Sequence, residues 1–99
     1  MHPLDMKQEA FRAWLHAHEH EVVGHPGTCF HSPLAEWLSS MTGHVYGVDG
    51  KHYGRASWDF QFWFLLPQWA ERFAARTERL CSHEVTGREA FAVLCAPVW

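Results

Sequence analysis

The sequence predicts a small α+β domain in which a two-stranded antiparallel hairpin packs against about four helices, in the order α-α-β-β-α-α. Three observations predict this fold: apolar stripes of helical period on both sides of the chain's middle, a period-two segment between them, and an Asp-Gly turn before that segment. With 99 residues and 47% hydrophobic residues, the chain suits one ordered domain, residues 1–99. Because a lone hairpin is only marginally stable, we expect the helices to cover it.

The first helix is predicted to begin at Asp5, which has Gln8 three residues later in the capping-box position. Gly24 and the Pro26-Gly27 turn are predicted to end it. Between these limits one side of the helix is apolar, and we interpret its one histidine as a core residue. This stripe consists of Phe11, Trp14, Leu15, His18 and Val22.

The second helix has clear signals at both ends. Ser32 is a suitable N-cap, Pro33 suits the first helical position, and Gly43 suits the residue after the helix. We expect its buried face to consist of Leu34, Trp37, Leu38 and Met41.

The middle of the chain changes to a period of two. Apolar residues occupy the even positions from Arg55 to Phe64, which predicts a half-buried strand with Trp63 on its polar face. Its partner is the segment from His44 to Val48, joined through Asp49-Gly50. A two-residue loop would place Val45 on the face of Trp58 and Phe60, whereas a three-residue loop would place Tyr46 there.

Two further helices follow the strands. The third has Pro67 in its first turn and extends to about Cys81, with Leu66, Trp69, Phe73, Thr77 and Leu80 on one side. The last begins with the capping box Thr86-Gly87-Arg88-Glu89 and carries Ala90, Phe91, Leu94 and Cys95 on its apolar face, Cys95 as a core residue. We expect the centre of the core to contain Trp37, Trp58, Phe60, Trp69 and Phe73.

Composition narrows the function classes. No apolar run reaches the length of a membrane helix, and a formal charge of −3 makes a nucleic-acid partner unlikely. Three cysteines without CxxC spacing argue against a disulfide framework, so we expect a cytoplasmic protein. The absence of Ile and Asn and the scarcity of Lys indicate a GC-rich genome, bacterial or phage. We attribute Gly47, Gly50 and Gly54 to turns rather than to a phosphate-binding loop.

Histidine is the compositional outlier, with nine residues, five of them from His16 to His31. Two of these are spaced i, i+4, which allows two imidazoles to hold one metal ion on a helix face. Zinc binding is therefore the alternative function, although neither HExxH nor a zinc-finger spacing occurs. Its ligands would come from His16, His20, His25, Cys29 and His31.

Cysteine chemistry supplies a second alternative, a small enzyme with Cys29 as nucleophile between His25 and His31. Cys81, near His83 and Glu84, offers similar neighbours in the sequence. The chain contains no G-x-S-x-G elbow and no pair of carboxylates with acid–base spacing. Catalysis is therefore not the expected function, and no cofactor is expected besides the alternative zinc.

The main expectation is a small protein-binding protein, of adaptor or inhibitor type, that acts through an aromatic and arginine surface. Arg72, Arg76 and Arg79 form a row at i, i+4 and i+7 on the third helix, available for an acidic partner or for internal ion pairs. Aromatic side chains not assigned to the core would complete the surface, because exposed aromatics and Arg are enriched at interfaces. These are Trp63, Tyr53 and Trp99. The partner would be another protein, or a second copy of the chain.

Overall fold

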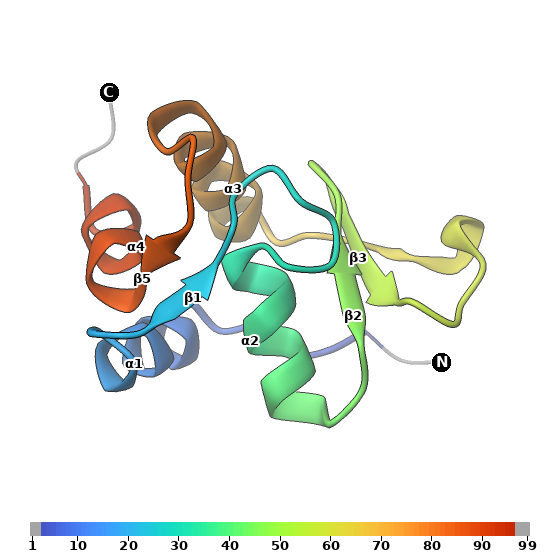
Figure 1. The fold of residues 1–99 in the computed structure, drawn as a ribbon. Coiled ribbons are helices and arrows are strands. Elements are labelled where there is room, and N and C mark those ends of the chain that lie inside the picture. Colours follow the sequence, from blue (N-terminus) through green and yellow to red (C-terminus); the bar gives the residue numbers. More distant parts are fainter. Residues whose placement is uncertain (1–2, 97–99) are drawn as a thin grey trace.

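The computed structural model describes residues 3–96 and contains four α-helices and two small antiparallel sheets (Figure 1). The expected α+β class and the four helices are confirmed. Trp99, one of the aromatics expected at the surface, lies outside the described residues. No helix within residues 3–96 has the length and apolar character needed to cross a bilayer.

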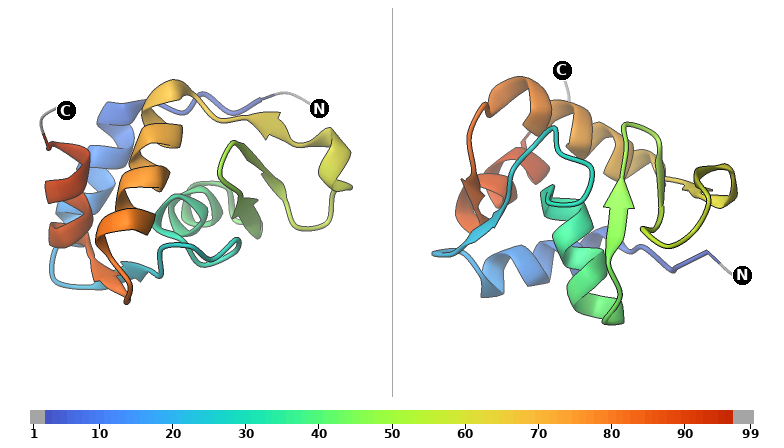
Figure 2. Two further views of the ribbon diagram at one scale, coloured as in Figure 1. Left: turned by 90° about the horizontal axis from the view of Figure 1, so that it is seen from above. Right: turned by 45° about the vertical axis from the view of Figure 1, so that its right-hand side comes forward.

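One half of the molecule, here called the helical half, contains α1 (Gln8–Ala17), α3 (Gln68–Leu80) and α4 (Gly87–Leu94). Figure 2 shows these three helices side by side, and α4 contacts both α1 and α3. A short ribbon of β1 (Val22–Gly24) and β5 (Val85–Thr86) joins them. Helices distant in sequence therefore share one core.

The other half, here called the hairpin half, is a three-stranded antiparallel sheet in the order β2-β3-β4 with a projecting arm. Its strands are β2 (Tyr46–Val48), β3 (His52–Arg55) and β4 (Phe64–Leu65). The arm, residues 56–63, includes the 3₁₀ helix η1 (Phe60–Phe62) and projects away from α1 and α4 (Figure 1). Between the two halves lies α2 (Pro33–Thr42), which contacts both β1 and β2.

An aromatic cluster forms the centre of the core. The Phe11 ring is fully buried and lies 5.0 Å from the Trp37 ring, 5.6 Å from that of Trp69 and 4.9 Å from that of Phe73. These rings come from α1, α2 and α3, so one side chain links three helices. Trp37 and Phe73 are buried as expected, and Trp69 is half-buried against the same cluster.

Local helix signals were confirmed in α2 and α4. The Ser32 hydroxyl accepts a hydrogen bond from the Ala35 N–H, and Gly43 ends α2 with a φ of 78°. Thr86 and Glu89 form the reciprocal capping box of α4. Such signals depend on neighbouring residues only, which is why the sequence predicts them well.

The first helix differs from the prediction at both ends. It begins at Gln8 with Lys7 as N-cap and without a side-chain cap, so Asp5 and Gln8 form no capping box. It ends at Ala17, because the chain turns and Val22–Gly24 pairs with β5 instead of continuing the helix. His18 is therefore outside the helix and half-exposed, so its assignment to the core is wrong.

The predicted strand from Arg55 to Phe64 is also wrong. The hairpin is formed by β2 and β3, with Tyr46 opposite Arg55 and Val48 opposite Tyr53, and β4 adds a third strand. After Arg55 the chain turns, and the Asp59 side chain caps η1 by accepting a hydrogen bond from the Gln61 N–H. The turn after Arg55, closed by the Trp58 N–H donating to the Arg55 carbonyl at 3.0 Å, and the capped 3₁₀ helix therefore interrupt the alternating apolar pattern.

Of the two residues that the sequence allowed on the face of Trp58, the structure places Tyr46 there and not Val45. The Tyr46 ring is buried and lies edge-on to that of Trp58 at 6.1 Å, whereas Val45 is exposed. Trp58 is half-buried, and Phe60 is 55% exposed instead of belonging to the core.

Four other side chains expected on buried faces are exposed. Met41 and Leu80 lie in the last turns of α2 and α3. Cys95 is the C-cap of α4 and is exposed. Val22, assigned to the apolar stripe of the first helix, is also exposed.

Candidate functional site

Two glycines create a flat area on the outer face of the hairpin. Gly47 in β2 lies opposite Gly54 in β3, and the Trp63 indole covers both. A Cβ atom at Gly54 would lie 2.4 Å from the Trp63 ring, and one at Gly47 would lie 2.6 Å from it. Neither glycine has a positive φ. The explanation of Gly47 and Gly54 by turns is therefore wrong, because their function is to let an indole approach the backbone.

Two phenylalanines extend this layer. The Phe60 ring lies 5.0 Å from the Trp63 ring, and Phe30 approaches Gly47 so closely that a Cβ there would lie 2.8 Å from it. The edge of the Phe60 ring also meets His52, at 5.8 Å. We call Phe30, Phe60 and Trp63 the aromatic platform.

The platform is bordered by exposed apolar residues. Leu65 lies opposite His52, so alternation along the strands places it on the same outer face as Gly54 and Trp63. Phe60 is 55% exposed and Leu65 72% exposed, while Phe62 of η1 is 52% exposed. A concentration of exposed apolar side chains is typical of interaction sites in soluble proteins.

Exposed apolar side chains concentrate in this part of the described chain. Within residues 3–96 eight large apolar side chains are exposed, and five of them belong to the hairpin half or its border. These five are Phe30, Val45, Phe60, Phe62 and Leu65. The distribution therefore distinguishes the hairpin half from a surface with scattered apolar residues.

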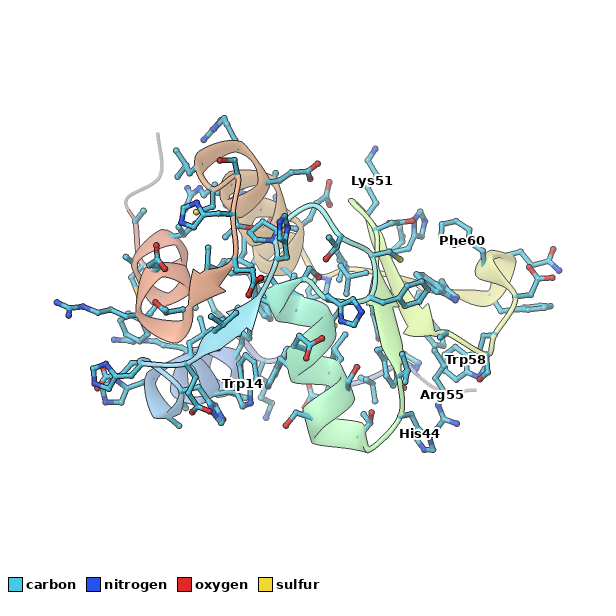
Figure 3. The ribbon with its side chains drawn as sticks, viewed as in Figure 1. Trp14, His44, Lys51, Arg55, Trp58 and Phe60 are labelled. Carbon is cyan, nitrogen blue, oxygen red and sulfur yellow. The ribbon has the colours of Figure 1, made fainter. Side chains whose placement is uncertain are left out.

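Charge around the platform is balanced. Figure 3 places Lys51, Arg55, Trp58, Phe60 and His44 on the hairpin side of the molecule, with Trp14 in the helical half. The Arg55 guanidinium lies over the Trp58 ring at 5.3 Å from its centroid. The Asp49 carboxylate accepts the Lys51 N–H and lies 3.3 Å from His52. Binding at this face would therefore depend on apolar contact more than on net charge.

Tyr53 does not contribute to this surface. It is only 2% exposed, and its hydroxyl accepts a hydrogen bond from the Leu4 N–H at 2.8 Å. Burial raises the pKa of the Tyr53 phenol above its usual value. The expectation of an exposed Tyr53 is wrong because alternation in β3 directs it inward, opposite to Gly54. Trp63, the other strand aromatic expected outside the core, is half-buried on the outer face.

The arginine row lies on α3, apart from the platform. Arg72 and Arg79 are exposed. Arg76 is half-buried, and its Nη1 donates a hydrogen bond to the Ala96 carbonyl at 3.3 Å, which connects α3 with the end of α4. This bond gives Arg76 a structural role, while a docking role for Arg72, Arg76 and Arg79 stays a prediction.

The histidines are accompanied by carboxylates. His16 and His20 approach the two oxygens of Glu19 at 3.9 and 3.4 Å, and His18 approaches Glu21 at 2.9 Å. His31 lies 3.1 Å from Glu36. These pairs are at the surface, where each contributes about 0–1 kcal/mol.

The expected metal ligands are not gathered into one cluster. The Nδ1 of His25 lies 2.9 Å from the Pro26 carbonyl oxygen, and Cys29 lies beside Val48. Throughout the described part of the chain, no three His, Cys, Asp or Glu side chains are arranged to hold a metal ion. The structure therefore adds no support to zinc binding by His16, His20, His25, Cys29 and His31, which stays an untested alternative.

The cysteine environments do not favour nucleophilic catalysis. Burial raises the pKa of the Cys29 thiol, an effect that the Val48 backbone opposes and the Asp49 charge reinforces. Burial also raises the pKa of the Cys81 thiol. A reactive cysteine usually has a lowered pKa, because the thiolate is the attacking species.

The sequence pattern identified Trp63 as an aromatic residue outside the core but did not identify its neighbours in the platform. Phe30 was unassigned, Phe60 was placed in the core, and Phe62 was placed on the apolar side of the predicted strand. The signal that could have found them is Asp59, a residue type that caps helices and interrupts strands. No protein-family model matches the chain, and searches of curated proteins and of solved structures also found no match.

Proposed function

We propose that the protein binds another protein through the aromatic platform of Phe30, Phe60 and Trp63, bordered by Leu65. The observation that carries the proposal is the exposure of Phe60 and Leu65 beside an indole that is fixed on two facing glycines. A rigid aromatic anchor loses little side-chain entropy on binding, which suits it to an interface hot spot.

The shape of this region favours a partner with a concave surface. Phe60 belongs to an arm that projects from the sheet, so its ring can enter an apolar cleft of a second protein (Figure 1). The balanced charge of the hairpin half supports apolar recognition in place of the arginine-based recognition expected from the sequence. The three free cysteines of the chain accord with a cytoplasmic site of action.

The test is site-specific photocrosslinking in the native host, followed by binding measurements with the purified partner. A photoreactive phenylalanine analogue at position 60 should capture one partner, whereas the same analogue at position 80 should not. Phe60→Ser and Leu65→Ser should each weaken that complex by about thirty-fold or more, the effect of losing a hot spot.

The matched control is Leu80→Ser, because Leu80 is 56% exposed and lies on α3, away from the platform. This variant should bind within about two-fold of the unmodified protein. Equal weakening by Leu80→Ser and Phe60→Ser would contradict the proposal. The captured partner could instead be a second copy of the chain. If Phe60→Ser then abolishes the dimers seen in sedimentation equilibrium, the platform serves self-association and not binding to a foreign protein.

A further inference from the structure

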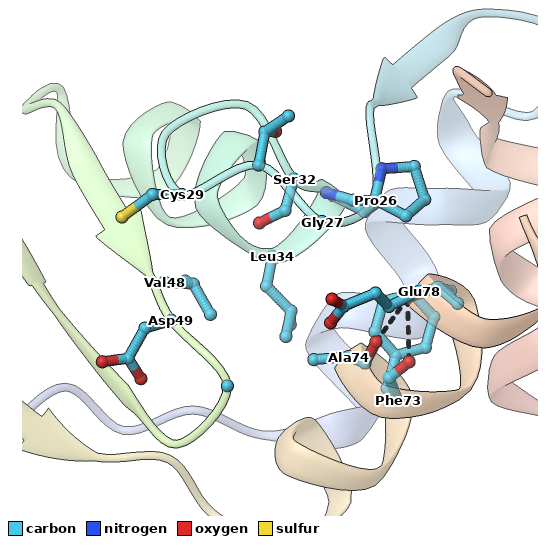
Figure 4. Close-up of a pocket in the computed structure, with 14 residues that line it drawn as sticks. Pro26, Gly27, Cys29, Ser32, Leu34, Val48, Asp49, Phe73, Ala74 and Glu78 are labelled. Carbon is cyan, nitrogen blue, oxygen red and sulfur yellow. Dashed lines mark hydrogen bonds between the residues drawn. The ribbon is translucent and has the colours of Figure 1, made fainter. Parts of the chain in front are cut away.

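A pocket of about 260 Å³ lies on the inner side of the hairpin turn. Its walls come from the loop at Pro26–Cys29, the start of α2, the hairpin turn at Val48–Gly50, and α3 (Figure 4). Leu34, Val48, Phe73 and Ala74 supply an apolar lining. This space is large enough for a short alkyl chain with a polar end.

The charged groups of the pocket are carboxylates, which accept hydrogen bonds. Its fourteen lining residues include the carboxylates of Asp49 and Glu78 and contain no Lys, Arg or His. In Figure 4 the Glu78 carboxylate points from α3 towards Leu34, whereas the Asp49 carboxylate and the Cys29 thiol point away from the space. The Asp49 oxygen Oδ1 is already occupied by the Lys51 N–H. Glu78 is therefore the carboxylate available to a ligand.

Two hydroxyls add to this acceptor character. The Ser32 hydroxyl points into the same space and accepts the Ala35 N–H at 3.3 Å, which leaves it a second lone pair. Thr28 donates its hydroxyl hydrogen to the His25 carbonyl at 2.7 Å, so its oxygen can only accept from a ligand. Across the described residues, no Lys, Arg or His forms an ion pair with Glu78.

We propose that this pocket binds a primary alkylammonium group, with the alkyl chain against Leu34, Val48 and Phe73 and the ammonium at Glu78. The arrangement suits such a ligand because a cationic head can stay near solvent while its stem covers apolar surface. The ion pair lies at the mouth of the pocket, so affinity is weak, in the range measured by titration at millimolar concentrations. The site is separate from the aromatic platform.

The experiment is an NMR titration of the ¹⁵N-labelled protein with n-butylammonium chloride, at constant ionic strength. The amide signals of Cys29, Val48 and Ala74 should shift in a saturable way. Glu78→Gln should weaken binding at least five-fold, and n-butanol should bind at least five-fold more weakly than n-butylammonium. Identical affinity in Glu78→Gln, or shifts spread evenly over the molecule, would overturn the proposal.

Two variants control for fold and for bulk charge. Glu71→Gln removes a carboxylate from the same helix outside the pocket and should leave binding unchanged. Ala74→Leu fills the pocket and should abolish binding, while dispersion of the amide spectrum reports that the protein is folded. Phe60→Ser should have no effect, so failure of the platform proposal and failure of the pocket proposal are distinguishable.

A second ligand identifies the source of the ammonium group. Nα-acetyl-lysine N-methylamide presents the same group on a peptide side chain. Binding within about three-fold of n-butylammonium would assign the pocket to a lysine side chain, whereas binding of n-butylammonium alone would assign it to a free amine. Absence of saturable binding by both would refute the site.

Discussion

The helical half and the hairpin half contain the same kinds of aromatic residue but use them in opposite ways. Phe11 in α1 is fully buried and meets rings from two other helices, whereas Phe60 in the arm is 55% exposed and rests on one indole. A high aromatic content therefore does not by itself indicate a large core. In this molecule the aromatics divide between a core that stabilises the fold and a surface that is available to a partner.

The largest difference should appear when each phenylalanine is truncated. Phe11→Ala should lower the free energy of unfolding by about 3–5 kcal/mol, because it leaves a cavity among tightly packed rings. Phe60→Ala should change it by at most about 0.5–1 kcal/mol, because the ring is mostly in solvent. Urea denaturation followed by circular dichroism measures both.

If Phe11→Ala does not fold, Phe11→Leu supplies a measurable loss at the same position. Equal losses from truncation at positions 11 and 60 would show that the arm is part of the stabilising core. The distinction between the two halves would then be wrong.

A smaller effect should come from the glycines under the platform. Gly54→Ala places a Cβ where the Trp63 ring lies, so we expect a loss of about 1–3 kcal/mol and a change in tryptophan fluorescence. Gly50→Ala is the matched control in the same hairpin, since no atom lies within 4 Å of the added Cβ. If both substitutions have the same small effect, the indole is not fixed on the hairpin and the platform is not rigid.

The smallest effect concerns the N-terminal end of α4 and depends on pH. The Thr86 backbone N–H, with help from the Thr86 hydroxyl and His83, lowers the pKa of Glu89. A lowered folded pKa means that the charged form stabilises the fold at neutral pH, and that this contribution is lost as the pH falls through the folded pKa.

Glu89→Gln should therefore cost roughly 0.3–1 kcal/mol at pH 7, at the low end because the side chain is exposed, and less at pH 3. Thermal unfolding of both proteins at the two pH values measures the difference. A cost that is the same at both values would attribute the effect to helix propensity instead of charge. Because the change lies in the helical half, spectroscopic signals from residues of the aromatic platform should not change.

Several predictions from the sequence were accurate where the cause is local, although the local capping box expected at Asp5 does not form. The N-cap at Ser32, the C-cap at Gly43 and the capping box at Thr86 each depend on atoms within a few residues. The Asp-Gly turn of the hairpin belongs to the same group.

Predictions failed where the cause is distant in the chain. Val22 continues the apolar stripe of α1, but pairing with Thr86 places it in a strand. The alternating pattern from Arg55 to Phe64 fits a strand, but no partner pairs along its whole length, and Asp59 caps η1 instead. Pairing partners of this kind are not encoded in local periodicity.

The candidate site was predictable only in part, because some of its features are local and others depend on contacts between distant parts of the chain. Trp63 could be recognised outside the core because it breaks the alternation of its segment. Tyr53 could not be placed, because one residue of register decides whether it faces Leu4 or the solvent. Phe30 could not be assigned, because the whole of α2 separates it in the sequence from Gly47, which it approaches in the fold.

The pairing of β1 with β5 has a consequence for the order in which the protein forms during translation. Val22 and Thr86 are more than sixty residues apart, so α1 has no α4 to pack against until almost all of the described chain has emerged from the ribosome. The hairpin at Tyr46–Arg55 is complete much earlier and closes only a short loop. The nascent chain therefore presents its aromatic arm before the helices that stabilise the molecule can assemble, which makes this arm the segment most exposed to early association.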